Sequence, residues 1–361
     1  MTQTQIIAGA LALCAICSTS LGETQRSWRV SDAAGLIAAV KAIPTDGGII
    51  SLEPGTYEIT EPLVFKGKSQ VNIEGSGWST VIKKRGDGDA IVFDGNCWNC
   101  RIHSLKLQGD KDAKSGSGIV YRNGEWSGIN VVDYCHIDCF PESGIRYEGN
   151  PAKPFSSNTI SNCWLTNNNS DQIYSAYNND FYIVGNQLGC GPGRSPRTGA
   201  RLDHSSAGTY SMNYHWGNDI ALKLGPGANF NRIENNRFEQ SRQTGIMIGN
   251  PPPSPLMKGG KIGVNDPSQL NIIVGNTIHT NSEGASGKFN AVEAHDAHAF
   301  TFTNNQIFSW DSSAVKCKSG LALGKNCVKW IIKDNIIRHC TAEPIVYDPK
   351  DGHIVKDNIV D

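Results

Sequence analysis

The chain has 361 residues, of which 39% are apolar and 19% are charged, and its formal net charge is −1. This composition excludes a disordered chain, and the lack of a basic excess argues against general nucleic-acid binding, so we expect no nucleic-acid partner. The 39 glycines suit a fold with many tight turns.

Residues 1–22 predict a signal peptide. Ile6 to Cys17 is an apolar run of the length expected for a secretory h-region, and Ser20 and Gly22 are small residues at a plausible cleavage position. No Lys or Arg precedes the run, so a short buried N-terminal helix is the alternative. We expect a secreted or periplasmic/extracellular protein. No other stretch approaches the ~18–20 apolar residues of a membrane span, so no such span is expected.

Cysteine usage leaves several possibilities open. The chain has 11 cysteines, and removal of Cys14 and Cys17 with the signal peptide would leave 11 − 2 = 9. An odd number leaves at least one free thiol unless another chain supplies a partner. Cys97 and Cys100 form a CxxC without a second CxxC at zinc-ribbon spacing. A local disulfide or packed thiols therefore explain this pair better than a metal.

After the leader, the first predicted element is an amphipathic helix over Ser31 to Ile43, with Ser31 as the N-cap. Short strands follow in Gly47 to Tyr57 and Val71 to Trp78. A helix at this end would cover the apolar interior of a stack of strands that is otherwise open.

A short repeat then runs to the C-terminus. Asn is followed two residues later by an apolar residue at intervals of about 22–40 residues, which is typical of a solenoid. The repeated Asn residues are Asn186, Asn236, Asn276, Asn305, Asn335 and Asn358; Asn213 fills the gap between Asn186 and Asn236, and Cys135 and Cys163 fall in the same frame. Asn at one turn of every coil predicts an amide ladder. Before nearly every Asn lies a short strand, such as Tyr182 to Val184.

A second strand in each coil is often introduced by Ser, Gly or Ala, and its Ile or Val is predicted to point inward, because strand side chains alternate between faces. The expected strands are 118–121, 144–147, 172–175, 199–202, 219–222, 245–248, 291–294, 314–317 and 344–347. Short runs punctuated by Gly and Asn exclude a helical repeat.

Together, GGIISLEPGTY, VNIEGSG and the Asn-punctuated coils resemble the pectate-lyase-like superfamily of right-handed β-helices. The resemblance covers roughly residues 28–361. It implies an all-β fold, a single right-handed parallel β-helix with an N-terminal capping helix, and we predict one such domain over 23–361. The superfamily includes polysaccharide lyases, glycoside hydrolases, epimerases, tailspikes and non-catalytic surface proteins, so fold alone does not settle function.

The outward positions of the second strand define two predicted rows of side chains. One row reads Val120, Arg146, Tyr174, Arg201, Ala221, Met247, Glu293, Lys316 and Val346. Its neighbour reads Arg122, Glu148, Ala176, Asp203, Lys223, Gly249, His295, Lys318 and Asp348. These charges fit two interpretations, either a solvated surface with weak salt bridges or a groove that binds an acidic polysaccharide.

The stretch from Gly193 to Leu224 is the richest in reactive side chains. Breaking a uronate glycosidic bond by β-elimination needs a base, a cation that neutralises the carboxylate and an acid for the leaving oxygen. Arg201 and Lys223 are expected to supply the neutralising cation and the base. Because Arg201 would lower the pKa of the Lys223 amine, Lys223 is favoured as the base, and His204 is an alternative base. Asp203 and Glu148 are expected to bind Ca²⁺, which lyases of this fold often use. Expected substrate-binding residues are Arg146, Tyr174, Arg194, Arg197, Trp216, Glu293, His295 and Lys316.

Three hypotheses therefore remain. A secreted lyase that acts on an acidic polysaccharide is slightly preferred. Leu202-Asp203-His204 resembles the end of the pectate-lyase WIDH motif, with Arg201 in place of the Trp. A glycoside hydrolase in the same groove would need two flanking carboxylates. A non-catalytic carbohydrate-binding or adhesive protein is the third. The sequence predicts no particular oligomeric state.

Overall fold

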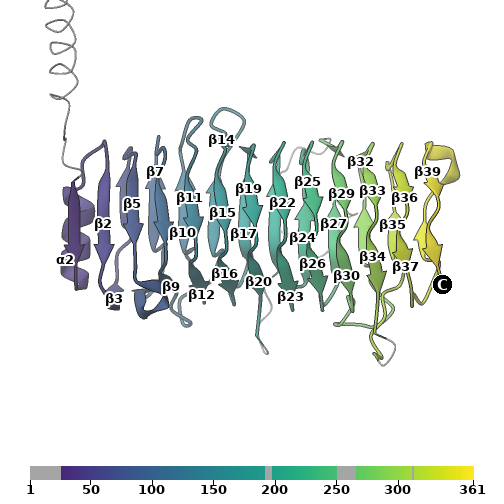
Figure 1. Cartoon of the computed structure of the whole chain (residues 1–361), viewed down its shortest axis with the longest axis horizontal. Helices are drawn as coiled ribbons and strands as arrows, with labels where there is room; N and C mark the ends of the chain where they lie inside the picture. Colours follow the sequence, from purple (N-terminus) through teal and green to yellow (C-terminus); the bar gives the residue numbers. More distant parts are fainter. Residues whose placement is uncertain (1–25, 192–196, 250–265, 311–312) are drawn as a thin grey trace, which may run out of the picture.

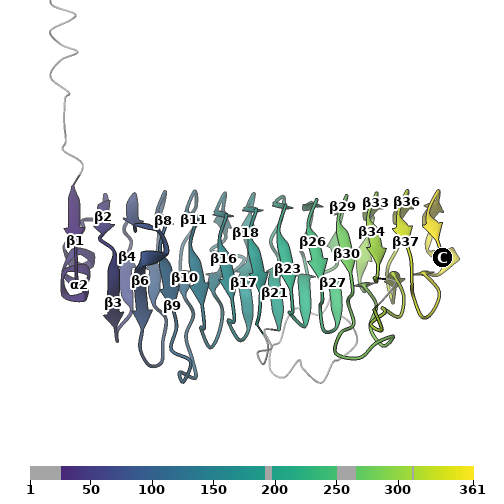
Figure 2. The ribbon, with the colours of Figure 1, turned by 60° about the horizontal axis from the view of Figure 1, so that its bottom comes forward.

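A computed structural model describes residues 26–191, 197–249, 266–310 and 313–361. Within them the chain winds into a three-sided stack of parallel strands, with one short helix at the first coil and the C-terminus at the opposite end (Figures 1 and 2). We name the three sides sheets A, B and C. The predicted signal peptide, 1–22, lies outside the described residues. Among the helices that are described, none combines the length and apolarity that crossing a membrane requires.

Sheet A has 13 strands. They are β1 (Ser27–Val30), β2 (Gly48–Leu52), β5 (Val71–Glu74), β8 (Arg101–His103), β11 (Val131–Asp133), β15 (Thr159–Ser161), β19 (Tyr182–Val184), β22 (Thr209–Ser211), β25 (Arg232–Glu234), β29 (Ile272–Val274), β33 (Thr301–Thr303), β36 (Ile331–Lys333) and β39 (Ile354–Lys356).

Sheet B has 12 strands, each of which follows a sheet A strand after a short turn. They are β3 (Gly55–Ile59), β6 (Thr80–Lys84), β9 (Lys106–Gln108), β12 (His136–Asp138), β16 (Trp164–Thr166), β20 (Gln187–Gly189), β23 (Tyr214–Trp216), β26 (Arg237–Glu239), β30 (Thr277–His279), β34 (Gln306–Phe308), β37 (Ile336–Ile337) and β40 (Ile359–Val360).

Sheet C has 11 strands. They are β4 (Leu63–Lys66), β7 (Ile91–Asp94), β10 (Ile119–Arg122), β13 (Ile145–Glu148), β17 (Asp171–Ala176), β21 (Thr198–Asp203), β24 (Ile220–Leu224), β27 (Thr244–Ile248), β31 (Val292–Ala294), β35 (Leu321–Leu323) and β38 (Ile345–Val346). Two small sheets pair β14 (Phe155–Ser156) with β18 (Asn178–Asn179) and β28 (Ser268–Gln269) with β32 (Ala297–His298). Two 3₁₀ turns are η1 (Gly77–Ser79) and η2 (Pro349–Asp351).

The predicted helix is present as α2 (Ala33–Ala42), but it begins later than expected. Asp32, not Ser31, is the N-cap, and its side chain accepts a hydrogen bond from the Gly35 amide at 2.7 Å. Leu36, Ala39 and Val40 are buried against the first coil. The helix therefore covers the N-terminal end of the stack, as predicted.

The asparagine ladder is confirmed between sheets A and B. The Asn236 Oδ1 atom accepts from the Asn213 backbone amide at 2.9 Å, and the Asn236 Nδ2 atom donates to the Tyr210 carbonyl at 3.0 Å. The same pattern recurs at Asn276 and Asn305. Each side chain thus satisfies a backbone amide and a carbonyl of the preceding coil, which fixes the register of the stack.

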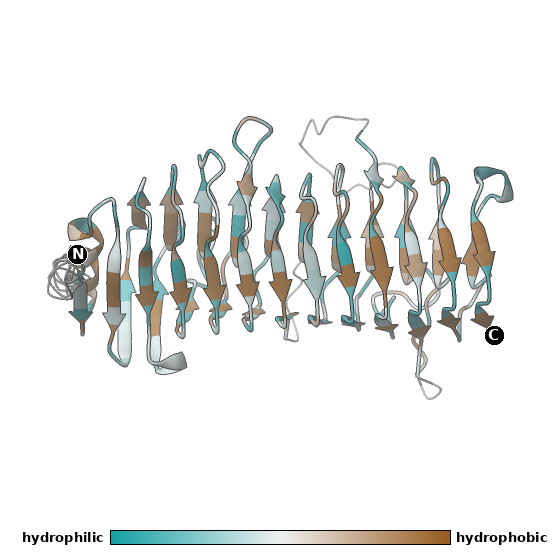
Figure 3. Ribbon diagram, turned by 45° about the horizontal axis from the view of Figure 1, so that its top comes forward, coloured by the Kyte–Doolittle hydropathy of each residue, from teal (hydrophilic) through white to brown (hydrophobic). Residues whose placement is uncertain are grey.

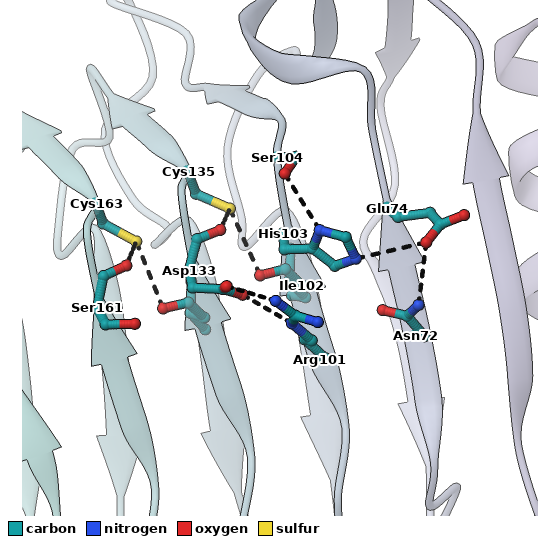
Figure 4. A network of polar contacts seen from close by, with 11 residues as sticks. Asn72, Glu74, Arg101, Ile102, His103, Ser104, Asp133, Cys135, Ser161 and Cys163 are labelled. Atoms are coloured by element: carbon teal, nitrogen blue, oxygen red, sulfur yellow. Dashed lines mark hydrogen bonds and ion pairs between the residues drawn. The ribbon is translucent and has the colours of Figure 1, made fainter.

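Cysteines take the ladder position in two earlier coils, as the sequence frame predicts. The Cys135 thiol donates to the Ile102 carbonyl at 3.6 Å, and the Cys163 thiol donates to the Val132 carbonyl at 3.5 Å (Figure 4). Each thiol reaches the carbonyl of the preceding coil that an Asn amide reaches elsewhere. Figure 4 also shows Arg101 paired with Asp133 on the outer face of sheet A, at 2.6 Å.

The core is one continuous column of stacked apolar side chains. Figure 3 shows hydrophobic residues in the strands of successive coils, with mostly hydrophilic turns between them. On the inner face of sheet C the rings of Phe93, Tyr121 and Tyr147 stack at centroid distances of 4.8 and 4.6 Å. The predicted inward column from Ile119 to Ile345 is present, with two corrections described next.

Two predicted strands of sheet C are misplaced. Residues 314–317 form no strand, and the coil instead uses β35, whose Leu321 pairs with Val292. In the 219–222 segment the register is displaced by two residues, so that Leu222, not Ile220, pairs with Ala200. Because a displacement by two keeps the same faces, Lys223 still points outward, but it moves from one row to the other.

Candidate functional site

The corrected register places four outward side chains in one row across sheet C. Arg146, Tyr174, Arg201 and Lys223 are successive Cα partners on β13, β17, β21 and β24. Adjacent strands are ~4.8 Å apart, so these side chains are direct neighbours. Met247 and Glu293 continue the same row on β27 and β31. We call these six residues the sheet C row.

Tyr174 lies between two arginines. The guanidinium groups of Arg146 and Arg201 each lie 5.4 Å from the centre of its ring, which is cation–π distance. Burial and the nearby Asp203 carboxylate raise the pKa of the Tyr174 hydroxyl, and the arginines oppose that shift. Tyr174 therefore stays protonated and can donate a hydrogen bond or a proton.

Asp203 is held against Arg201 by the close approach of the next coil. Its Oδ2 atom lies 2.6 Å from the Arg201 Nη2 atom, and its side chain is almost fully buried. A Cβ atom at Gly225 would lie 1.8 Å from the Asp203 Oδ1 atom. Only glycine at position 225 leaves room for this carboxylate, so the backbone directly after β24 helps to position the ion pair.

Lys223 is the most deeply buried cation of the row, with 7% of its surface exposed. Burial lowers the pKa of its amine, the charge of Arg201 lowers it further, and Asp203 and Asp171 oppose the shift. Asp171, which the sequence reasoning missed, lies in the same cluster. Burial raises the pKa of the Asp171 carboxyl group, and Arg201 partly offsets this. The row therefore combines an amine that loses its proton more easily than usual with a fixed guanidinium.

His204 does not join this row. It lies in the turn after β21, where its ring stacks on Tyr177 at 4.5 Å and its Nδ1 atom is 3.3 Å from the Asp266 carboxylate. Glu293 and His295 pair with each other at 2.9 Å, two coils beyond Lys223. Hydrogen bonds from His295 and Asn290 lower the pKa of the Glu293 carboxyl group, with burial opposing them.

The remaining predicted binding residues lie elsewhere. Trp216 belongs to sheet B, so it does not face the row, and Lys316 lies in a loop before β35, where Ala322 takes the predicted row position. Ala221 is fully buried and is not part of the row. Arg197 is exposed directly before β21. Burial raises the pKa of the Asp219 carboxyl group, and the Arg197 charge lowers it. Arg194 lies outside the described residues.

Asp203 and Glu148, the predicted calcium ligands, are not neighbours in the stack. Ala176 lies between them in the stack, and Glu148 is engaged by Arg146 at 2.7 Å, as Asp203 is by Arg201. Across the described parts of the chain, no three His, Cys, Asp or Glu side chains gather in a way that could hold a metal ion. Carboxylates already neutralised by arginine are poor ligands for Ca²⁺, so these residues do not fit the ion as arranged.

Comparison with solved structures identifies the fold. The A-module of the mannuronan C-5 epimerase AlgE6 from Azotobacter vinelandii aligns with 94% of this chain and 97% of its own length, with a TM-score of 0.62 and 13% identity. The fold is a right-handed parallel β-helix. The DFA-IIIase of Arthrobacter chlorophenolicus A6 aligns with 96% of this chain and 94% of its own, with a TM-score of 0.62 and 12% identity.

An alginate lyase from Paenibacillus sp. aligns with 82% of this β-helix and 99% of its own length, with a TM-score of 0.57 and 15% identity. No protein-family model and no curated protein sequence matches this chain. At these identities the likeness establishes the fold, and the function has to be argued from the site.

Proposed function

We propose that this protein is an enzyme that cleaves an acidic polysaccharide by β-elimination at the sheet C row. The observation that carries the proposal is that Arg201 and Lys223 are Cα partners on neighbouring strands. The Lys223 amine is almost fully buried, and burial and the arginine charge both lower its pKa. Three fold neighbours, named as a mannuronan C-5 epimerase, an alginate lyase and a DFA-IIIase, support an activity on carbohydrates.

The proposed reaction assigns one task to each neighbour in the row. The Arg201 guanidinium pairs with the uronate carboxylate and stabilises the charge that develops on it. The neutral Lys223 amine takes the proton from the carbon beside that carboxylate. The electron pair forms a carbon–carbon double bond as the glycosidic C–O bond breaks, and the protonated Tyr174 hydroxyl supplies a proton to the leaving oxygen. Asp203 keeps the Arg201 guanidinium in position.

A glycoside hydrolase is the second candidate, and one observation favours it. Asp171 and Asp203 lie in neighbouring coils close enough for their charges to interact, and burial raises the pKa of Asp171. A protonated and an ionised carboxyl group are the pair that hydrolysis uses. The involvement of Asp203 in the Arg201 ion pair makes elimination the preferred reaction.

The deciding experiment incubates the full-length protein with alginate, polygalacturonate and hyaluronan, and follows both absorbance near ~235 nm and reducing ends. Elimination yields the unsaturated, absorbing product, whereas hydrolysis yields reducing ends alone. Lys223→Met is expected to abolish the absorbance change, and Lys333→Met, on the outer face of sheet A, is expected to leave it unchanged. Absence of product from every substrate would contradict both enzyme proposals and would favour a binding protein.

Export is part of this proposal, because polysaccharides of this kind lie outside the cell. N-terminal sequencing of protein recovered from the medium or periplasm tests whether residues 1–22 are removed. Calcium dependence remains a prediction of the sequence, and activity in the presence of a chelator tests it.

A further inference from the structure

The outer face of sheet B carries a strip of aromatic side chains that the proposed reaction does not use. We call Trp78, Trp164, Tyr214, Trp216, Phe308 and Trp310 the aromatic strip. The ring centroids of Trp78 and Trp164 lie 5.6 Å apart, and those of Trp164 and Trp216 lie 6.2 Å apart. The centroids of Phe308 and Trp310 lie 5.4 Å apart. Trp164 lies on β16, Tyr214 and Trp216 on β23, and Phe308 on β34, with β20, β26 and β30 between these strands in sheet B (Figure 1). Trp78 lies in η1, and Trp310 follows β34. At ~4.8 Å per strand, the strip follows the stack axis for about 24 Å.

Three of the six rings are exposed despite their size, and Tyr214, Trp216 and Phe308 are half-buried. Trp78 is 49% exposed, Trp164 36% and Trp310 54%. Single exposed apolar residues are common on protein surfaces, but neighbouring exposed rings, such as Trp78 with Trp164, indicate a binding surface. Trp216 is also specifically accommodated, since a Cβ atom at Gly189 would lie 2.2 Å from its ring. Glycine in β20 therefore lets the indole lie against the neighbouring strand and meet Trp164.

A polar cluster lies between the two aromatic ends. The Tyr214 hydroxyl donates to the Glu239 Oε1 atom at 2.7 Å, and the His279 Nε2 atom lies 3.0 Å from the Glu239 Oε2 atom. Arg237 pairs with the same carboxylate and lies over the Tyr214 ring at 5.1 Å. Glu239 is buried beneath these partners, whereas the Arg237 side chain is 52% exposed.

The accessible charges of this stretch of sheet B are consequently positive. Its other outward carboxylate, Asp138, is buried and accepts hydrogen bonds from Thr166 at 3.1 Å and Asn167 at 2.9 Å. Lys106 and Arg237 remain accessible to solvent on the outward row. A ligand that matches this surface is long, narrow and anionic, and it has apolar faces that can lie on aromatic rings.

We propose that the aromatic strip is a second glycan-binding surface, which holds an anionic polysaccharide chain along the stack axis. Its aromatic rings contact the apolar faces of the sugars, and Arg237 and Lys106 pair with carboxylate or sulfate groups. This surface is separate from the sheet C row, because the two lie on different sides of the three-sided coil. It would hold a long substrate near the reaction site without taking part in bond cleavage.

Affinity electrophoresis of the full-length protein through gels containing alginate, polygalacturonate or hyaluronan tests this proposal. The wild type is expected to be retarded by at least one of them, and Trp164→Ala/Trp216→Ala is expected to weaken that binding about tenfold or more. Arg237→Gln is a second variant that leaves the aromatic rings in place, and it should weaken binding and reduce its dependence on salt. Tyr182→Ala, which removes a 52% exposed ring from sheet A, is the matched control.

Lys223→Met separates this proposal from the proposed reaction, since it should abolish cleavage and keep the retardation. Circular dichroism and thermal unfolding establish that each variant is folded. Retardation that is lost in Lys223→Met but kept in both sheet B variants would overturn the second surface, as would a wild type that no polysaccharide retards. Light scattering that shows a dimer dissociated by Trp164→Ala/Trp216→Ala, without glycan binding, would instead identify the strip as a contact between copies of this chain.

Discussion

Replacing one asparagine in the middle of the ladder should be far more costly than replacing one at its end. The Asn236 Oδ1 atom accepts from the backbone amide of Asn213 at 2.9 Å and from its Nδ2 atom at 3.1 Å, and all of these groups are buried. Asn236→Ala leaves two buried donors without an acceptor. Each such donor costs about 1–3 kcal/mol, so we expect a loss of about 4 kcal/mol of unfolding free energy.

Asn358 offers a matched control, because it makes the same contacts at the end of the stack. Its Oδ1 atom accepts from the Asn335 backbone amide at 3.0 Å and from the Asn335 Nδ2 atom at 2.9 Å, but this site is only partly buried. Water can replace the lost acceptor there, so Asn358→Ala should cost about 1 kcal/mol or less.

Equilibrium urea unfolding of both variants measures the difference. Because coils of a solenoid can unfold in stages, hydrogen exchange of the Asn213 amide should be measured in parallel. Equal losses for the two variants, or a loss below about 1 kcal/mol for Asn236→Ala, would refute the argument that buried ladder contacts hold the register.

Three further predictions follow from buried titratable groups. Burial lowers the pKa of His215 to about 3 from 6.5, so the unfolded chain binds more protons as the pH falls below 6.5, and stability declines. Between pH 7 and pH 4, the unfolding free energy of His215→Phe should fall by about 3 kcal/mol less than that of the wild type. Urea midpoints that shift equally with pH in the two proteins would contradict this. If Lys223 is the base, cleavage should increase with pH up to its lowered pKa, and Lys223→Arg, which stays charged, should be inactive throughout; an active variant would exclude this role. The Cys317 and Cys340 sulfur atoms lie 3.6 Å apart, so oxidised glutathione should convert the two thiols into a disulfide and release two reduced glutathione molecules. Closing this loop, whose ends are 23 positions apart, should stabilise the protein by about 3.5 kcal/mol, with Cys317→Ser as the control for peptide mapping and urea unfolding.

Local patterns in the sequence were sufficient to predict the β-helix. The spacing of the Asn residues and the alternation of inward and outward side chains within strands are properties of single coils. The structure confirms the first at Asn186 and the second at Ile119. Cys135 and Cys163 could be placed in the Asn frame for the same reason. The sequence did not determine the first residue of the helix, because Ser31 and Asp32 are both good N-caps and only the backbone geometry selects Asp32.

The candidate site depended on contacts between coils, which no single repeat encodes. The sequence determined that Arg201 and Lys223 point outward on sheet C. It could not distinguish Ile220 from Leu222 as the inward partner of Ala200, since a displacement by two residues preserves the pattern of faces. Only the stacked coils decided that Lys223 lies directly beside Arg201, that Gly225 leaves room for Asp203, and that Trp216 belongs to another side of the molecule.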